Sequence, residues 1–117
     1  MNNKFILTET KKVIHGITLY QIQAVRSFGN VTEGDLGGWI EKEENLSEDG
    51  DAWVYDSATV SGDARISDNA WVYGDARVSG DARVFGNAQV FGNAQVAGDD
   101  WVAGDAWFWG DINLWNN

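Results

Sequence analysis

An aliphatic or aromatic residue returns at every sixth position over more than half of this chain. The series runs without interruption through Val54, Val60, Ile66, Val72, Val78, Val84, Val90, Val96, Val102, Phe108 and Leu114. Most of these residues are followed four places later by an alanine, usually after a Gly-Asp or Gly-Asn pair. One six-residue unit cannot bury its own apolar side, so such a chain becomes stable only when its repeats stack into a continuous core. The sequence therefore predicts an all-β solenoid of short strands joined by tight corners.

Residues eighteen positions apart are more alike than residues six positions apart. One family of such triplets comprises Trp53-Val54-Tyr55, Trp71-Val72-Tyr73, Gln89-Val90-Phe91 and Trp107-Phe108-Trp109. Three repeats per coil explain this longer period, which predicts a three-sided parallel β-helix with about 18 residues per coil. Each coil then rises by one strand spacing, roughly 4.8 Å. Because side chains alternate across a strand, the two neighbours of each core residue point outward.

The N-terminal part has a different pattern. Residues 4–8 and 16–28 alternate as two strands, with Lys11, Lys12 and His15 in their connection, and predict a β-hairpin that caps the solenoid. The Gly37-Gly38 pair and residues 45–47 are predicted to form turns. We therefore divide the chain into a hairpin cap (1–28), an irregular acidic segment (29–51) and a hexapeptide-repeat solenoid (52–117), which together form one structural domain.

Composition and charge exclude several classes of function. The chain lacks cysteine, so disulfides and thiolate metal sites cannot contribute to it. Its net charge is −10, with +3 in residues 1–28, −7 in residues 29–52 and −6 in the remainder. This acidity disfavours direct binding to nucleic acid and to anionic membranes. No apolar run is long enough for a membrane span or a signal peptide, so we expect a cytoplasmic protein without a cofactor.

The repeat unit Val-x-Gly-Asp/Asn-Ala-x resembles the hexapeptide repeat of left-handed parallel β-helices, a fold best known from hexapeptide acyltransferases. Residues 23–31, 37–40, 45–47 and 50–56 also resemble the N-terminal part of YdcK-like hexapeptide-repeat proteins and of small phage and prophage proteins. The resemblance implies a left-handed coil. It also suggests a phage or prophage origin, with residence in the host cytoplasm, and raises acyl transfer from acyl-CoA as an activity. A shared fold does not by itself establish that chemistry.

Two sets of residues are candidates for chemistry, and each has a simpler structural explanation. In hexapeptide acyltransferases a histidine acts as general base, and His15 is the single histidine here. A solvent-exposed loop histidine is the simpler interpretation, so we assign no catalytic residue. The aspartates Asp63, Asp81 and Asp99 share one corner column and could hold a cation. Hydrogen-bonded corner turns explain them equally well, so we assign no metal site.

One side of the predicted prism is aromatic. The residues expected to point outward there, and to form an interface, are Trp53, Tyr55, Trp71, Tyr73, Phe91, Trp107 and Trp109. Soluble monomers seldom expose more than a few hundred Å² of contiguous apolar surface, so we expect a cover over these rings. A second copy in a dimer or trimer, a partner protein, or the protein's own hairpin could provide it.

The position four residues after a core residue is usually alanine, but near the end of the chain it is occupied by Asp100 and Ile112. No further coil would cover these positions, so we expect Asp100 to reach water and Ile112 to spread over the open end. The predicted C-terminal cap comprises Asp100, Phe108, Ile112 and Trp115.

These observations lead to three functional hypotheses. The first is a non-enzymatic binding or assembly protein that self-associates, or binds a protein partner, through the aromatic side. The second is an acyltransferase-like protein that uses acyl-CoA. The third is an acidic decoy that occupies a host nucleic-acid-binding or defence protein, which its charge of −10 would favour.

Overall fold

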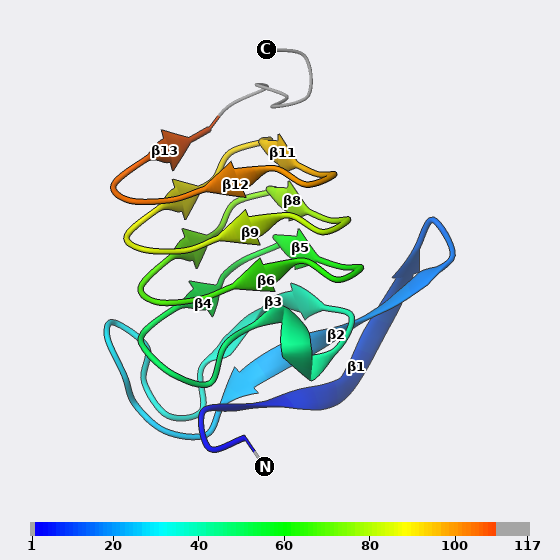
Figure 1. The fold of residues 1–117 in the computed structure, drawn as a ribbon. Coiled ribbons are helices and arrows are strands. Elements are labelled where there is room, and N and C mark those ends of the chain that lie inside the picture. Colours follow the sequence, from blue (N-terminus) through cyan, green and yellow to red (C-terminus); the bar gives the residue numbers. More distant parts are fainter. Residues whose placement is uncertain (1, 110–117) are drawn as a thin grey trace.

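The computed structural model describes residues 2–109, which form a three-sided parallel β-solenoid with an N-terminal hairpin (Figure 1). The aromatic face consists of β4 (Trp53–Val54), β7 (Trp71–Val72), β10 (Gln89–Val90) and β13 (Trp107–Phe108). The arginine face consists of β6 (Arg65–Ile66), β9 (Arg83–Val84) and β12 (Trp101–Val102). The hairpin face contains β3 (Leu36–Ile40), β5 (Thr59–Val60), β8 (Arg77–Val78) and β11 (Gln95–Val96).

Successive coils are joined by backbone hydrogen bonds at the predicted eighteen-residue spacing. Val54 pairs with Val72, and Val60 pairs with Val78. The N–H of Ser61 donates to the carbonyl of Val78 at 2.9 Å, for example, and each neighbouring coil repeats such bonds. The chain crosses the front of the coil through β6, β9 and β12 and returns behind as it climbs, which makes the coil left-handed (Figure 1). The predicted fold class is therefore confirmed.

The hydrophobic core is one column along the solenoid axis. It contains the sixth-position residues from Val54 to Val96 and the alanines that follow them, nearly all with no exposed surface. Alanine is required because its side chain points inward next to a corner, where the two sides of the coil converge.

Backbone conformation explains the residues at the corners. Gly80 and its equivalents adopt φ angles near Gly80's +66°, in the left-handed region. Asp56 and Asp68 occupy the same corner position with φ of 57° and 60°. Their carboxylates accept hydrogen bonds from the N–H groups of Gly74 (3.2 Å) and Gly86 (2.9 Å), one coil further on. Aspartate tolerates this conformation and also satisfies the next corner.

The N-terminal hairpin extends the hairpin face beyond the first coil. Its strands β1 (Phe5–Ile14) and β2 (Ile17–Ala24) pair antiparallel, and β2 pairs antiparallel with β3. The predicted hairpin is present, but Lys11 and Lys12 lie within β1 rather than in the connection. An irregularity between Leu7 and Lys11 lets the strand continue where the sequence alternation breaks. The connection is reduced to a turn at His15 and Gly16, at the tip of an arm that projects from the solenoid (Figure 1).

Stacking begins before residue 52. Ile40 pairs with Val60 and Leu46 with Ile66, both twenty residues apart instead of eighteen. The two surplus residues are absorbed after Leu46, where the N–H groups of Asp51 and Ala52 both donate to the carbonyl of Asp68, at 3.0 and 2.9 Å. The three-segment division of the chain stays a prediction, but the acidic segment already supplies two sides of a coil.

A buried asparagine fixes this first coil on the second. Asn45 ends the 3₁₀ turn η1 (Glu43–Asn45) and is fully buried. Its amide nitrogen donates to the carbonyls of Gly62 (3.1 Å) and Ala64 (2.8 Å), and its amide oxygen accepts from the N–H groups of Glu41 and Lys42. All four hydrogen-bonding positions of the side chain are thus satisfied, as a buried amide requires.

A buried lysine fastens the start of the hairpin. Lys4 has no exposed surface, and its Nζ donates to the carbonyl of Ser47 at 3.0 Å and lies 4.8 Å from the centre of the Phe28 ring. Burial, reinforced by the nearby charge of Arg26, lowers the pKa of Lys4 from 10.5 to about 8. Within residues 2–109, no helix has the length and apolar character needed to cross a lipid bilayer.

Replacing a corner glycine should destabilise the fold through contact with the next coil. In Gly80→Ala the new Cβ would lie 2.8 Å from the nitrogen of Gly98, whereas in Gly104→Ala no described atom lies within 4 Å. Both positions have similar φ angles, so both variants carry similar backbone strain. We expect urea denaturation to show a loss of roughly 1–3 kcal/mol more for Gly80→Ala than for Gly104→Ala, the range typical of overpacking. Equal losses would contradict the importance of corner stacking.

Lys4 should make stability rise with pH in the alkaline range. Between the folded pKa of about 8 and the unfolded value of 10.5, the unfolded chain binds more protons at this site, so the free energy of unfolding increases with pH. Comparison of the wild type with Lys4→Met in urea at several pH values isolates this contribution. Relative to the variant, the wild type should gain on the order of 3 kcal/mol between pH 7 and 11. A pH-independent difference would contradict the assignment.

Candidate functional site

Aromatic rings form a continuous series across the coils of the aromatic face. Tyr55 packs edge-to-face on Trp71, Tyr73 stacks on Phe91 at 5.0 Å between ring centres, and Phe91 stacks on Trp109 at 6.4 Å. The hydroxyl of Tyr73 donates to the side chain of Gln89 at 2.8 Å. Exposure rises along the series, from half-buried rings in the lower coils to Trp107 (65%) and Trp109 (55%). Ring stacking between coils therefore accounts for only part of this surface.

Trp53 does not belong to the exposed surface, so its predicted place in an interface is wrong. Only 1% of its surface is exposed, because Phe5 and Phe28 pack against it at ring-centre distances of 6.3 and 5.3 Å. Gly37 lies in β3, not in the predicted turn, and any Cβ on it would meet the Trp53 ring at 2.8 Å. The hairpin and its following loop thus cover the lowest ring of the face.

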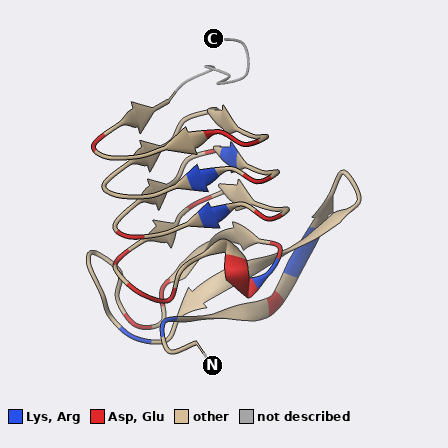
Figure 2. Ribbon diagram, viewed as in Figure 1, with Lys and Arg blue, Asp and Glu red and all other residues tan. Residues whose placement is uncertain are grey.

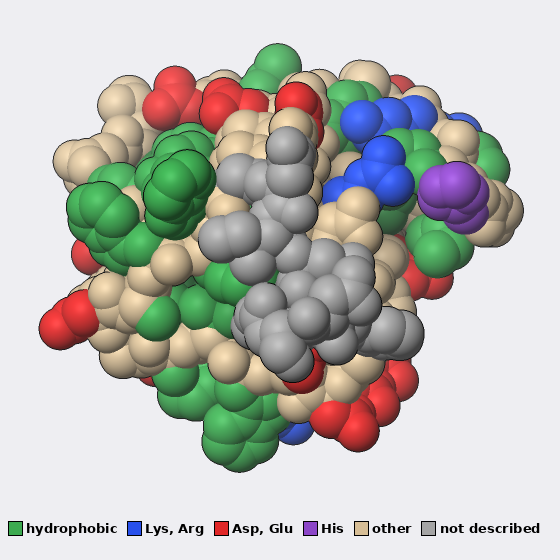
Figure 3. Space-filling model, turned by 90° about the horizontal axis from the view of Figure 1, so that it is seen from above, with side chains coloured by type: hydrophobic (Ala, Val, Ile, Leu, Met, Phe, Trp, Pro, Cys, Tyr) green, Lys and Arg blue, Asp and Glu red, His purple; other side chains and the backbone are tan. Residues whose placement is uncertain are grey.

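The outward residues of the aromatic face carry no charge in the described chain. They are aromatic apart from Gln89, whereas the other two faces carry Arg65, Arg77 and Arg83. Figure 2 shows the charged residues along the corners and on the other sides. Seen along the axis, a hydrophobic patch lies over the side that β13 occupies, with acidic groups at its margin (Figure 3). The surface has an apolar centre and a polar rim, as in protein interfaces.

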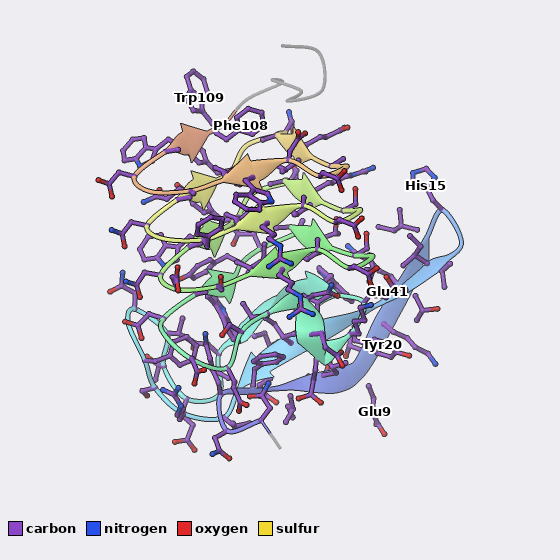
Figure 4. The ribbon with its side chains drawn as sticks, viewed as in Figure 1. Glu9, His15, Tyr20, Glu41, Phe108 and Trp109 are labelled. Carbon is purple, nitrogen blue, oxygen red and sulfur yellow. The ribbon has the colours of Figure 1, made fainter. Side chains whose placement is uncertain are left out.

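His15 lies at the tip of the hairpin arm, apart from Glu9 and Glu41 (Figure 4). Among the described residues it makes no hydrogen bond or ion pair that would orient an imidazole for proton transfer. It does line a groove of about 230 Å³ between the arm and the hairpin face, opposite Arg77, Ser79 and Gln95. The structure thus brings His15 near polar groups of the repeats, which the sequence did not indicate.

In one coil a lysine pairs with the acidic corner column. Asp63 accepts a hydrogen bond from Lys42 at 2.6 Å, and this contact lowers the pKa of Asp63 and raises that of Lys42. Asp81 and Asp99 are exposed. Within residues 2–109, no three acidic or imidazole groups converge as a metal site would require.

The C-terminal cap is described only in part. Phe108 packs partly against the core while Trp109 points away from the coil (Figure 4). Asp100 was expected to reach water, but its Oδ2 is buried and has no hydrogen-bond partner among the described residues. Asp100 stands at the position that an inward-pointing alanine occupies in the other coils, so its carboxylate is turned toward the core. Ile112 and Trp115 lie outside the described residues.

A groove lies on the arginine face, and the sequence did not single it out. Its volume is about 690 Å³, and its lining includes Glu43, Glu44, Arg65, Arg83, Phe85 and Trp101. The eighteen-residue spacing could have indicated this groove, because it places Arg65, Arg83 and Trp101 in one outward column. Trp101 packs edge-to-face on Phe85 at 5.8 Å and is 66% exposed.

Comparison with known proteins agrees with the fold. The YdcK beta-solenoid repeat family model matches residues 58–74, 64–78 and 76–89. A curated Escherichia coli K12 protein, "Uncharacterized acetyltransferase YdcK", is 38% identical over 52 residues, which are 44% of this chain and 15% of that protein. The chain therefore spans only a small part of the relative's length. Repeat, coil geometry and sequence similarity together make this chain a hexapeptide-repeat β-solenoid protein similar to YdcK.

Proposed function

We propose that this protein is a non-enzymatic assembly module that self-associates through its aromatic face. The observation that carries the proposal is the uncharged ring series that ends in Trp107 and Trp109, both more than half exposed. Among residues 2–109, the hairpin and its following loop cover Trp53, whereas Trp107 and Trp109 at the other end of the face remain exposed. A second copy of the same face would remove the remaining rings from water.

Charge favours this arrangement over contact through the other faces. Each copy carries −10, so two copies repel wherever acidic corners meet. The aromatic face is the side whose outward strand residues carry no charge, which keeps that repulsion at the rim. Association by this face should therefore strengthen as salt screens the rim. The proposal includes the phage or prophage setting that the sequence resemblance suggests.

Removing the two most exposed rings of this face should abolish self-association. We expect sedimentation velocity to show an oligomer for the wild type, more populated in high salt, and a monomer for Trp107→Ser/Trp109→Ser. The matched control is Trp101→Ser on the arginine face, since Trp101 (66%) is as exposed as Trp107 (65%). A monomeric wild type, or equal loss of association in the control, would contradict the proposal.

Acyl transfer is a second candidate, favoured by one structural observation and one similarity. His15 lines the groove beside Arg77, Ser79 and Gln95, which offers a general base and an anion-binding group in one place. The similar protein of E. coli carries the name of an acetyltransferase. In this hypothesis His15 removes a proton from the acceptor, and Arg77 holds a phosphate of the donor.

Binding of acetyl-CoA separates this candidate from the first. Isothermal calorimetry should detect saturable binding that Arg77→Gln weakens, and His15→Ala should remove turnover while leaving binding unchanged. Without saturable binding of acetyl-CoA to the wild-type chain, the acyltransferase candidate fails while the assembly proposal remains intact.

A further inference from the structure

The groove on the arginine face is a mixed surface, with a separate chemistry at each end. Its lower end is bounded by Glu43 and Glu44 of η1, both exposed. The two guanidinium groups of Arg65 and Arg83 follow along the axis, and the Phe85–Trp101 pair forms the upper end. At about 690 Å³ the groove falls in the range typical of ligand sites.

The two arginines are the unusual feature of this groove. They lie at the same outward position on adjacent coils, so their backbones stand about one strand spacing apart, roughly 4.8 Å, and two like charges share one column. Neither makes a hydrogen bond or close ion pair with another described residue, although the chain carries an excess of acid. Two neighbouring guanidinium groups repel each other, and an anion bound to both offsets that repulsion; a carboxylate is the side-chain anion that pairs well with guanidinium groups.

The spacing along the groove matches an extended peptide. Glu43 and Glu44 lie beside the Leu46 coil position, one coil below Arg65, because Leu46 bridges to Ile66. Distances along the solenoid axis follow from strand spacings of about 4.8 Å. Measured from the acidic end, the midpoint of the arginine pair lies at about 7 Å and Trp101 at about 14 Å. In an extended chain, side chains two and four residues along a face stand at about 7 and 14 Å.

We propose that this groove binds an extended segment of a partner protein in which a basic, an acidic and an aromatic residue alternate with spacer residues. The basic side chain pairs with Glu43 and Glu44, and the acidic side chain lies between Arg65 and Arg83. The aromatic ring packs on Trp101. In this order each of these four charged side chains of the groove has a partner of opposite charge. The site lies on a different side of the solenoid from the proposed assembly face.

Synthetic peptides test the proposal directly. The probe is a blocked peptide with lysine, glutamate and phenylalanine at alternate positions and serine between them. Two controls have the same composition: in one the lysine and glutamate are exchanged, and in the other the three residues are adjacent. Isothermal calorimetry or NMR titration should show saturable binding of the probe, with both control peptides at least tenfold weaker.

Variants of the full chain assign the contact to the groove. Arg65→Gln/Arg83→Gln should weaken binding of the probe at least tenfold, and Trp101→Ala several-fold. The matched control Arg77→Gln, on the hairpin face, should leave it unchanged, and circular dichroism would show that all variants keep the fold. Equal binding of the charge-exchanged peptide, equal weakening by Arg77→Gln, or no saturable binding up to millimolar peptide would each overturn the proposal.

Discussion

Everything on the surface of this solenoid depends on the backbone hydrogen bonds that join each coil to the next. Because they tie residues eighteen apart, as Val54 is tied to Val72, each outward side chain has a neighbour of known identity about 4.8 Å away. Corner glycines keep this spacing constant, and aspartates at positions 56 and 68 satisfy the same corners by side-chain hydrogen bonds. A fixed axial period therefore aligns residues eighteen apart in columns along the solenoid, so the sequence of one column sets the order of side chains along one strip of surface.

The regular part of this fold was predictable from the sequence because each repeat presents the same local problem to the chain. Periodicity identified the core residues and the three sides, and the family resemblance supplied the handedness. The irregular part was not predictable. Ile40 and Leu46 enter the core two residues out of register, which the bulge at Asp51 and Ala52 corrects. Nothing in a six-residue pattern indicates where such a correction falls.

Side-chain exposure was harder to predict than side-chain direction. Trp53 points outward as the alternation requires, yet Phe5 and Phe28 bury it, because residues distant in sequence reach it through the hairpin. The groove on the arginine face has the same origin. Its lower wall comes from η1, whereas its floor comes from β6, β9 and β12. The acidic-decoy hypothesis gains little from this arrangement, since Arg65 and Arg83 interrupt the acidic surface beside Asp63 and Asp81.

Each coil contacts only the coils directly above and below it. This affects how such a chain can change over evolutionary time. Deleting or duplicating a block of eighteen residues removes or adds one coil and keeps the register in which the remaining coils pair. In most globular folds a change of that size would disrupt the core. Here selection can adjust the number of rungs, and with it the reach of each face, by recombination within a single gene.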